Sequence, residues 1–407
     1  MSKVIFINRY FYPDLSATSQ ILSELAFALA AKGQAVHVIT SQQLYENPTT
    51  RLAPEETANG VKIHRVRTTR FGRSRLLGRT LDYISFYFSV RWTLASIASP
   101  NDIVIAKTDP PLLSLTVMSA VKRRRARLVN WLQDLYPEVA IASGIWWLRG
   151  PIGAVLLFLR DRSLKAASAN VVVGERMGER LISRRIPREK IHFIPNFAAS
   201  EGIVPVAAAD NPLRKTWGLD EKFVVGYSGN LGRVHEFHTI LEAARLLKDN
   251  PRIVFLCIGG GRLFDMLVQS VEDRHLQDKF VFRPYQDRAS LKYSLSAPDV
   301  HWISLRPEFE GLVVPSKVYG IAAAGRPIIA ITARDGEVAT LVRHHRCGIA
   351  VEPGDALGLT SELIKLMENP SLCGDMGARA RFMSEGHVNQ AHAVERWLAL
   401  LTSQPLR

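Results

Sequence analysis

The chain has 407 residues, 47% of them hydrophobic and 22% charged, with a formal net charge of +14. This length exceeds one ordinary core and suits two domains, and the composition excludes a disordered chain. Residues 1–196 hold 28 Lys and Arg against 14 Asp and Glu, so the first half carries the whole positive excess. The three cysteines show no CxxC spacing, which argues against a disulfide framework or a zinc site and fits a reducing cytoplasm.

The N-terminus is expected to begin a strand rather than a signal peptide, because Lys3 is followed at once by the apolar run 4–7. No membrane-spanning helix is expected. The richest apolar stretch, residues 144–159, is broken by Arg149, whereas a span needs about 20 largely uncharged residues.

In the first half, short apolar runs alternate with longer helical patterns. A helix is predicted over about 19–31, ended by Gly33. The predicted strands cover residues 4–7, 35–40, 61–66, 103–106, 128–132 and 170–173. Such alternation predicts a parallel sheet with helices on both faces.

The second half restarts the pattern after a predicted linker over residues 196–215, which are rich in Ala, Pro and small residues. The predicted strands cover residues 223–228, 253–258, 280–282, 300–304, 328–331 and 348–351. Helices are predicted over about 236–248, 262–274, 287–296, 316–324 and 355–368. The fold class is therefore α/β, with two Rossmann-like, doubly wound domains facing a cleft, where ligands bind at the carboxyl ends of the strands.

The loop after the first strand is a candidate phosphate-binding loop. It contains Asp14 and the small residues Ser16, Ala17 and Thr18. Small residues let the backbone approach a phosphate at a helix N-terminus, where unpaired N–H groups favour anions. The alternative is that a hydroxyl residue of this loop only caps the helix.

A carboxylate follows the strand predicted at 128–132. Asp134 lies where a general base or an acceptor-binding carboxylate is useful. Its alternative role is to cap the next helix.

The second domain's first strand ends in a glycine-containing segment. Gly229 and Gly232 allow close backbone approach, and Arg233 and His235 can meet a diphosphate. A plain turn is the alternative. The triple glycine 259–261 is too generic to weigh, and neither first strand is followed by GxGxxG, which argues against NAD binding.

The segment 306–317 runs from a turn into a helix and ends on Lys317. The N–H groups of residues 313–318, with the Lys317 ammonium, are predicted to form a diphosphate cradle. Glu308 and Glu310 can reach sugar hydroxyls, with solvated loop charge as the alternative. The predicted donor-binding residues are Gly229, Asn230, Arg233, His235, Tyr285, Gly311, Leu312, Val313, Pro315, Ser316 and Lys317.

Several motifs together resemble a known family. They are LQDLYPE at 132–138, SGNLG at 228–232, GLVVPSK at 311–317 and AAAGRP at 322–327. Their order and spacing resemble the retaining GT-B glycosyltransferases numbered family 4. More narrowly, the chain is similar to the branch with the bacterial colanic-acid and O-antigen fucosyl and N-acetylfucosaminyl transferases. Weaker agreement extends the resemblance to nearly the whole chain.

The resemblance implies a donor domain, an acceptor domain and a returning helix. It predicts an N-terminal acceptor-binding, membrane-facing domain at 1–196, a nucleotide-sugar-binding domain at 197–387, and a helix at 388–407 that crosses back. The implied reaction uses no metal or other cofactor. A sugar, such as a 6-deoxy or N-acetylamino sugar, moves from UDP or GDP to a polyprenyl-diphosphate-linked acceptor in polysaccharide or O-antigen synthesis.

The chain departs from the family pattern at several site positions. The family's two glutamates fall on Leu312 and Gly320, and its diphosphate-binding Arg and Lys fall on Asn230 and His235. Gln133 stands where many members have a histidine near the reacting carbon. Arg233 and Lys317 are then the expected cations, and Asp134 and Glu310 the candidate catalytic carboxylates.

Basic and aromatic residues alternate in the first half. They are Arg65, Arg67, Arg70, Arg73, Arg75 and Arg79, the aromatic stretch 81–92, the basic run 122–127, Trp146 and Trp147. This mixture suits anionic lipid headgroups, at roughly 1 kcal/mol per Lys or Arg near the surface. It predicts a peripheral protein on the cytoplasmic face of the inner membrane. A merely solvated basic face is the alternative, and no motif for nucleic-acid binding accompanies these residues.

Two other functions remain open at this point. A nucleotide-sugar epimerase or hydrolase of GT-B shape would need no membrane. A non-catalytic partner of an active transferase would explain the missing glutamates.

Overall fold

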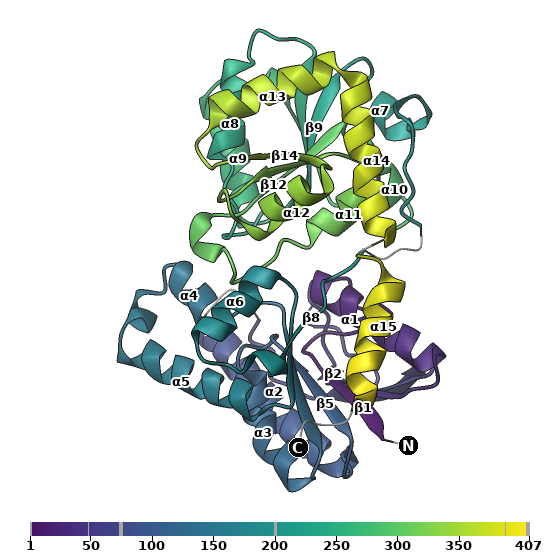
Figure 1. Ribbon diagram of the computed structural model, residues 1–407, viewed down its shortest axis with the longest axis vertical. Helices are drawn as coiled ribbons and strands as arrows, with labels where there is room; N and C mark the ends of the chain where they lie inside the picture. Colours follow the sequence, from purple (N-terminus) through teal and green to yellow (C-terminus); the bar gives the residue numbers. More distant parts are fainter. Residues whose placement is uncertain (1, 48, 73–75, 199–201, 387, 404–407) are drawn as a thin grey trace. The chain divides into compact units, whose positions relative to one another are not determined.

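The computed structural model describes residues 2–47, 49–72, 76–198, 202–386 and 388–403. The chain divides into two compact units. The N-terminal unit comprises residues 1–195 and 391–407, and the C-terminal unit comprises residues 196–390. Each is an α/β unit built on one sheet (Figure 1).

The N-terminal unit has an eight-stranded sheet in the order β3-β4-β2-β1-β5-β6-β7-β8, in which only the β3–β4 pair is antiparallel. Its strands are β1 (Lys3–Ile7), β2 (Ala35–Ser41), β3 (Glu55–Ala58), β4 (Val61–Val66), β5 (Ile103–Lys107), β6 (Arg127–Leu132), β7 (Ala169–Val172) and β8 (Ile191–Phe193). Its helices before the second unit are α1 (Ala17–Ala31), α2 (Leu76–Ile97), α3 (Leu113–Arg123), α4 (Glu138–Ala142), α5 (Pro151–Ala166) and α6 (Glu175–Ser183), with short 3₁₀ helices η1 (Trp146–Arg149) and η2 (Arg188–Lys190).

Alternating side chains of β1 show how helices cover both faces of this sheet. Ile5 and Ile7 enter the core formed with α2 and α3. Phe6 points to the other face, where its ring centroid lies 6.2 Å from that of Trp397 on α15 (Gln390–Thr402). Such strands read as continuous apolar runs because both faces are buried.

Helix α15 packs on the N-terminal unit although it follows the second unit in sequence (Figure 1, yellow). Trp397 is fully buried, and its ring centroid lies 5.0 Å from that of Trp131 on β6. Arg127 donates a hydrogen bond to the Ser403 carbonyl at 3.0 Å. The final helix therefore completes the core of the first unit.

The C-terminal unit has a wholly parallel six-stranded sheet in the order β11-β10-β9-β12-β13-β14. Its strands are β9 (Phe223–Asn230), β10 (Ile253–Gly260), β11 (Phe280–Arg283), β12 (Val300–Ser304), β13 (Ile328–Ile331) and β14 (Gly348–Val351). Its helices are α7 (Pro212–Thr216), α8 (His238–Leu246), α9 (Arg262–Asp273), α10 (Leu291–Ser296), α11 (Lys317–Ala323), α12 (Glu337–His345), α13 (Ala356–Glu368) and α14 (Pro370–Gly386), with η3 (Ala208–Asp210), η4 (Gln277–Lys279) and η5 (Pro307–Phe309).

Helices cover both faces of the C-terminal sheet as well. Tyr227 and Trp302 face α8, α9 and α13, whereas Ile303 faces α11, α12 and α14. All six strands predicted in this half are confirmed, and so is the doubly wound fold class. None of the described helices is long and apolar enough to cross a bilayer.

The structure differs from the sequence prediction over residues 196–215. The described residues of this stretch, 196–198 and 202–215, belong to the C-terminal unit and include most of α7. Arg214 is buried, pairs with Asp299 at 3.1 Å, and donates to three backbone carbonyls. The end of the predicted linker is therefore part of a core.

Candidate active site

The C-terminal sheet has its topological switch point between β9 and β12. Ligands of doubly wound sheets bind at such points, at the carboxyl ends of the strands. Lys317, the first residue of α11, places its Nζ there, 3.1 Å from Nε2 of His235. The same Nζ lies 5.3 Å from the centroid of the Tyr227 ring.

His235 is buried and uses both ring nitrogens. Nδ1 lies 2.5 Å from the Ser304 carbonyl oxygen, which only accepts, so Nδ1 carries the proton. Nε2 then accepts from the Lys317 ammonium. Burial, followed by the Lys317 charge, lowers the pKa of His235 to about 3, so the ring is neutral near pH 7.

Lys317 has a lowered pKa but remains mostly protonated at neutral pH. Burial lowers the pKa of Lys317 from 10.5 to about 8, so most of the ammonium persists at pH 7. Within the described ranges, no ion pair joins Lys317 to a carboxylate. A buried cation without a carboxylate partner is suited to a phosphate ligand.

Glycines at the ends of β9 and β10 allow close packing beside this lysine. A Cβ on Gly229 would lie 2.9 Å from Lys317 Cε, so the absent side chain makes room for the lysine stem. At Gly259, φ is +132°, and a Cβ would lie 2.2 Å from the Gly229 carbonyl oxygen. Gly259, part of the triple glycine judged too generic from the sequence, therefore lets the paired ends of β9 and β10 approach closely through their backbones.

The predicted backbone cradle is only partly available. The N–H groups of Val313 and Val318 donate to the carbonyls of Phe309 and Pro315, both at 3.4 Å. Leu312 and Val313 are also buried in the unit. Because α11 has only seven residues, the Lys317 side chain rather than the helix end is the candidate anion-binding group.

The other predicted donor residues lie at or after the ends of strands of the C-terminal sheet. Asn230 ends β9, and its carbonyl accepts from the Tyr227 hydroxyl at 2.8 Å. Arg233 is exposed in the following loop. Tyr285 follows β11, and its ring edge would meet a Cβ on Gly260 at 3.3 Å. Gly311, Pro315 and Ser316 lie in the segment that leads into α11.

Glu310 has a local partner in the structure. Its Oε2 accepts a hydrogen bond from the backbone N–H of Glu337, the first residue of α12, at 3.2 Å. This contact ties the segment before α11 to the start of α12. Glu308 forms an ion pair with Arg306.

In the N-terminal unit, a buried lysine lies beside carboxylates at the ends of β5 and β6. Lys107 is 2% exposed, and its Nζ donates to the Thr18 carbonyl at 2.9 Å. Burial lowers the pKa of Lys107 to about 7, opposed by Asp109 and Asp134. Burial, followed by Asp109, raises the pKa of Asp134 to about 6, opposed by Lys107. Asp134 can thus exchange a proton near neutral pH.

Sequence reasoning found Asp134 but missed Lys107 and Asp109. Lys107 is the last residue of β5, and Asp109 follows that strand as Asp134 follows β6, so their position at a strand end was the available signal. The Gln133 backbone N–H donates to Thr108 Oγ1 at 3.3 Å, which joins the two strand ends.

The predicted phosphate loop after β1 is internally bonded. Asp14 accepts from the Ser16 backbone N–H at 2.9 Å and from the Tyr45 backbone N–H. Ser16 is the N-cap residue of α1 by position, but its hydroxyl bonds Asp14 rather than the helix. Ala17 begins the helix, and the Thr18 carbonyl links the loop to Lys107.

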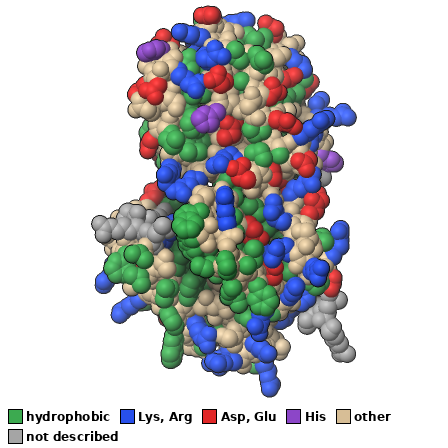
Figure 2. All heavy atoms as spheres, turned by 90° about the vertical axis from the view of Figure 1, so that its left-hand side faces the viewer, with side chains coloured by type: hydrophobic (Ala, Val, Ile, Leu, Met, Phe, Trp, Pro, Cys, Tyr) green, Lys and Arg blue, Asp and Glu red, His purple; other side chains and the backbone are tan. Residues whose placement is uncertain are grey.

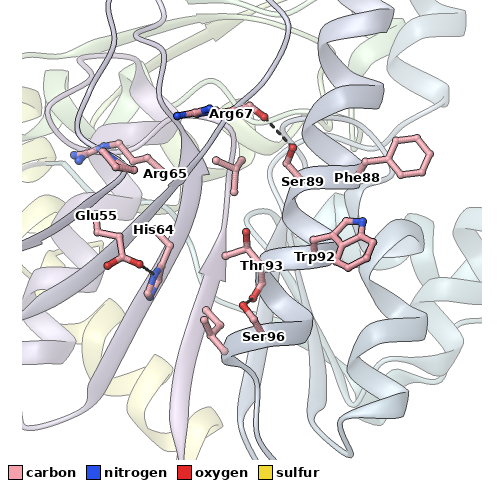
Figure 3. Close-up of a pocket in the computed structure, with 12 residues that line it drawn as sticks. Glu55, His64, Arg65, Arg67, Phe88, Ser89, Trp92, Thr93 and Ser96 are labelled. Atoms are coloured by element: carbon pink, nitrogen blue, oxygen red, sulfur yellow. Dashed lines mark hydrogen bonds and ion pairs between the residues drawn. The ribbon is translucent and has the colours of Figure 1, made fainter.

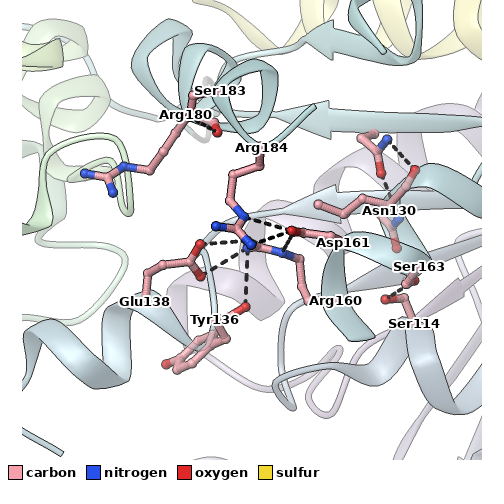
Figure 4. Close-up of polar contacts among 12 residues, drawn as sticks. Ser114, Asn130, Tyr136, Glu138, Arg160, Asp161, Ser163, Arg180, Ser183 and Arg184 are labelled. Carbon is pink, nitrogen blue, oxygen red and sulfur yellow. Dashed lines mark hydrogen bonds and ion pairs between the residues drawn. The ribbon is translucent and has the colours of Figure 1, made fainter. Parts of the chain in front are cut away.

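A buried ion network holds the segment after Asp134. Arg160 on α5 bonds Glu138 at 2.6 Å and Asp161 at 2.8 Å, and Arg184 bonds Asp161 at 2.7 Å (Figure 4). Arg160 also donates to the Tyr136 carbonyl at 3.4 Å. The network therefore fixes the QDLYPE segment against α5.

No cluster of three His, Cys, Asp or Glu side chains in the described ranges could hold a metal.

The outer stripe of α2 is apolar. Its exposed large hydrophobic side chains recur at helical spacing, with Trp92 78% exposed. They are Leu77, Leu81, Ile84, Phe88 and Trp92. Phe88 and Trp92 are among the residues that line a groove of about 520 Å³ beside β4. In Figure 3 their rings project away from His64 and Arg65 of that strand.

A second apolar surface covers η1 and the first half of α5. Its exposed members are Trp146, Trp147, Ile152, Val155 and Phe158. Helix α3 contacts both α2 and α5, so the two surfaces belong to one helical layer. Figure 2 shows hydrophobic side chains gathered on this unit, with Lys and Arg around them.

The cations near these surfaces only partly match the expected basic patch. Arg65 is 4% exposed and pairs with Glu56 at 2.6 Å, so its assignment to the surface is wrong. Arg67 and Arg70 are exposed, as are Lys122 and the three arginines at 123–125. Arg79 is partly exposed. Arg73 and Arg75 lie outside the described residues.

Comparison with known proteins assigns both halves of the chain. The family "Glycosyl transferases group 1" matches residues 210–383, and "Glycosyl transferase 4-like domain" matches residues 17–196. The chain is 32% identical over 308 residues to the probable glycosyltransferase WbjE of Pseudomonas aeruginosa, covering 74% of each. It is 27% identical over 335 residues to the putative colanic acid biosynthesis glycosyl transferase WcaI of Escherichia coli K12, covering 79% of this chain and 81% of that one.

Solved structures share the fold. Anabaena HepE in complex with UDP-glucose aligns with a TM-score of 0.73 at 17% identity, covering 99% of this chain and 100% of that one. Sucrose-phosphate synthase from Thermosynechococcus elongatus aligns with a TM-score of 0.78 at 17% identity, covering 98% of both chains. These are GT-B glycosyltransferase folds.

The fold and the family matches together define a class of enzyme. The chain belongs to the group 1 glycosyltransferases, the GT-B family numbered 4. It is therefore a glycosyltransferase, and the epimerase and non-catalytic alternatives are set aside.

Proposed function

We propose that the enzyme transfers a sugar from a UDP- or GDP-linked donor to a polyprenyl-diphosphate-linked acceptor during bacterial polysaccharide or O-antigen synthesis. The donor sugar falls in the hexose class that includes 6-deoxy and N-acetylamino sugars. The enzyme works at the cytoplasmic face of the inner membrane. The similarity to WbjE and to the colanic acid protein WcaI supports this setting.

The observation that carries the proposal is Lys317 at the switch point of the C-terminal sheet. Its ammonium lies between the Tyr227 ring and His235 without a carboxylate partner among the described residues. A nucleoside diphosphate supplies the missing negative charge. Arg233, which is exposed in the loop after β9, is the proposed second cation for the diphosphate, and the exposed Tyr285 ring is proposed to stack on the base.

The two cations also supply what a metal would otherwise supply. When the sugar leaves, negative charge grows on the diphosphate, and fixed positive groups stabilise it. Lys317 and Arg233 would do this without a divalent ion. The proposal therefore includes a metal-independent reaction.

Asp134 is proposed as the acceptor-side base in the N-terminal unit. A base with a pKa near the working pH is suited to take a proton from an attacking hydroxyl, and burial raises the pKa of Asp134 to about 6. Glu310 bonds α12, which favours a role in holding the donor segment over a role in proton transfer.

The apolar surfaces on α2, η1 and α5 support the proposal that the acceptor is lipid-linked. Aromatic side chains such as Trp92 and Trp146 suit the boundary between headgroups and acyl chains. Nearby exposed cations, including Arg67 and Lys122, suit anionic headgroups. This surface would bring the enzyme to an acceptor anchored in the bilayer.

A donor panel tests the proposal directly. Purified enzyme is mixed with UDP, GDP and their sugars, and its thermal unfolding is followed, because a ligand of the folded state raises stability. One nucleotide series should raise the unfolding temperature, and the rise should disappear in Lys317→Ala. If no nucleoside diphosphate has an effect, the assigned donor site is wrong.

A further inference from the structure

The closest polar neighbour of the proposed diphosphate cation is a histidine that carries no charge. His235 Nε2 and Lys317 Nζ are 3.1 Å apart, although the residues lie 82 positions apart in the chain. A neutral imidazole is an unusual partner for a buried ammonium, because it offers one lone pair and no negative charge. It can direct the ammonium without neutralising it.

Backbone contacts fix the histidine in turn. Its Nδ1 donates to the Ser304 carbonyl. The Ser304 hydroxyl donates to the Glu236 carbonyl at 2.6 Å and accepts from the Glu236 N–H at 3.1 Å. The Arg306 N–H donates to the Val234 carbonyl at 2.9 Å. The loop after β9 is thus bonded repeatedly to the end of β12, and His235 has little freedom to turn.

Two further contacts limit where Lys317 can go. The aliphatic part of the Lys317 side chain packs over Gly229, where a side chain is absent, and the Tyr227 ring lies beside the Lys317 ammonium. The Tyr227 hydroxyl donates to the Asn230 carbonyl at 2.8 Å, which holds that ring in place. His235 supplies the one directional contact to the ammonium among the described side chains.

We infer that His235 is a positioning residue of the donor site, whose neutral Nε2 directs the Lys317 ammonium toward the donor diphosphate while leaving its full positive charge for that ligand. This inference rests on the proposed role of Lys317 in donor binding. A carboxylate at the same place would pair with the lysine and weaken its attraction for phosphate.

The other titratable side chains described around His235 and Lys317 are neutral, bonded to other groups, or exposed. On β9 and β10, burial raises the pKa of Tyr227 well above its usual value and that of Cys257 to about 12, so both stay neutral. Glu236 accepts from the Thr239 N–H on α8 at 3.1 Å. Arg306 and Glu308 pair with each other after β12. Arg233, in the same loop as His235, is exposed.

The test compares UDP and GDP binding by isothermal titration in wild-type enzyme and two variants of His235. The amide of His235→Gln can donate to Ser304 and accept from Lys317, so it should bind the nucleotide within about threefold of wild type. His235→Leu loses the acceptor and should bind about tenfold more weakly, as for one charge-assisted hydrogen bond. If the leucine variant does not fold, the shorter His235→Asn takes its place with the same expectation.

A pH series separates positioning from a structural effect. Nucleotide affinity should fall as pH rises through about 8, because the Lys317 ammonium loses its proton there. Without an acceptor the buried ammonium is less stable, so in His235→Leu this fall should move to lower pH, and in His235→Gln it should stay. Equal affinities and equal pH profiles in all three proteins would overturn the inference, even if Lys317→Ala abolishes binding. If Lys317→Ala also binds normally, the donor site itself is misplaced.

Discussion

The two units use a buried lysine at the carboxyl end of their sheets in opposite ways. Lys107 is almost completely buried, donates to the Thr18 carbonyl, and lies near Asp109 and Asp134. Lys317 is less completely buried than Lys107 and bonds a neutral histidine. A lysine with carboxylate neighbours tunes those carboxylates, whereas a lysine without them remains available to an anionic ligand.

The outer surfaces of the units differ as well. The N-terminal unit carries the apolar stripe of α2 and the surface on η1 and α5, together with the excess of Lys and Arg. The C-terminal unit also exposes large apolar residues, such as Phe382, but at scattered places on several helices. Single exposed apolar residues need no explanation, whereas a continuous stripe marks a contact surface.

The largest expected effect is the loss of stability that follows when the ion network of the N-terminal unit is broken. Arg160→Met leaves Glu138 without its buried cation and leaves Asp161 with Arg184 alone, so it should lower the free energy of unfolding by about 3–5 kcal/mol. The exposed neighbour Arg162→Met is the matched control and should change it by about 0.5 kcal/mol or less. Calorimetry should show the loss while nucleotide binding persists. Equal stability of the two variants would contradict a structural role of the network.

The second effect concerns the donor cation. Lys317→Ala should weaken nucleoside diphosphate binding about 100-fold, which corresponds to the loss of a buried charge-assisted contact. Lys222→Ala is the control, because Lys222 lies in the same unit just before β9 begins and bonds the Pro251 carbonyl. Titration calorimetry should find the control unchanged. A loss of affinity in both variants would point to general destabilisation instead.

The third effect concerns the apolar surface. Phe88→Ser with Trp92→Ser should reduce binding to vesicles containing anionic phospholipid at least tenfold, since about 25 cal/mol is lost per Å² of apolar area no longer buried. Phe382→Ser on the C-terminal unit is the matched control, because Phe382 is 69% exposed and Phe88 is 64% exposed. Vesicle flotation measures both. Equal binding by all proteins would remove this surface from the membrane contact.

The smallest effect is on the pH profile of turnover. Rate should rise through about pH 6 as Asp134 loses its proton and fall through about pH 8 as Lys317 loses its own. Because Lys107 lowers the pKa of Asp134, Lys107→Met should move the acidic limb to higher pH and leave the alkaline limb in place. A shift of the alkaline limb in this variant would break the distinction between the two lysines.

Sequence patterns predicted the sheets well because most strands are buried on both faces and read as apolar runs. They missed β3, whose residues Glu55–Ala58 are polar and mostly exposed at the sheet edge. They also missed α14, which contains glycines unfavourable in helices. Gly377 is needed there because a Cβ would lie 2.4 Å from the Gly325 carbonyl oxygen, a contact that no local pattern reveals.

The candidate site was predictable as a set of strand-end segments but not as a set of contacts. Lys317, Asp134 and the Gly229 loop follow from position at the ends of strands. The Lys317–His235 bond depends on the pairing of β9 with β12 and on side-chain direction. The use of Val313 N–H within its own loop and the burial of Arg65 likewise depend on tertiary structure.

The most direct test of the central claim is release of nucleoside diphosphate from labelled UDP- and GDP-sugars by the purified enzyme. It is measured with and without a polyprenyl-diphosphate-linked acceptor in anionic vesicles. We expect release from one donor series, dependent on the acceptor and lost in Lys317→Ala. Equal release without acceptor, or full release by the Lys317→Ala variant, would contradict it.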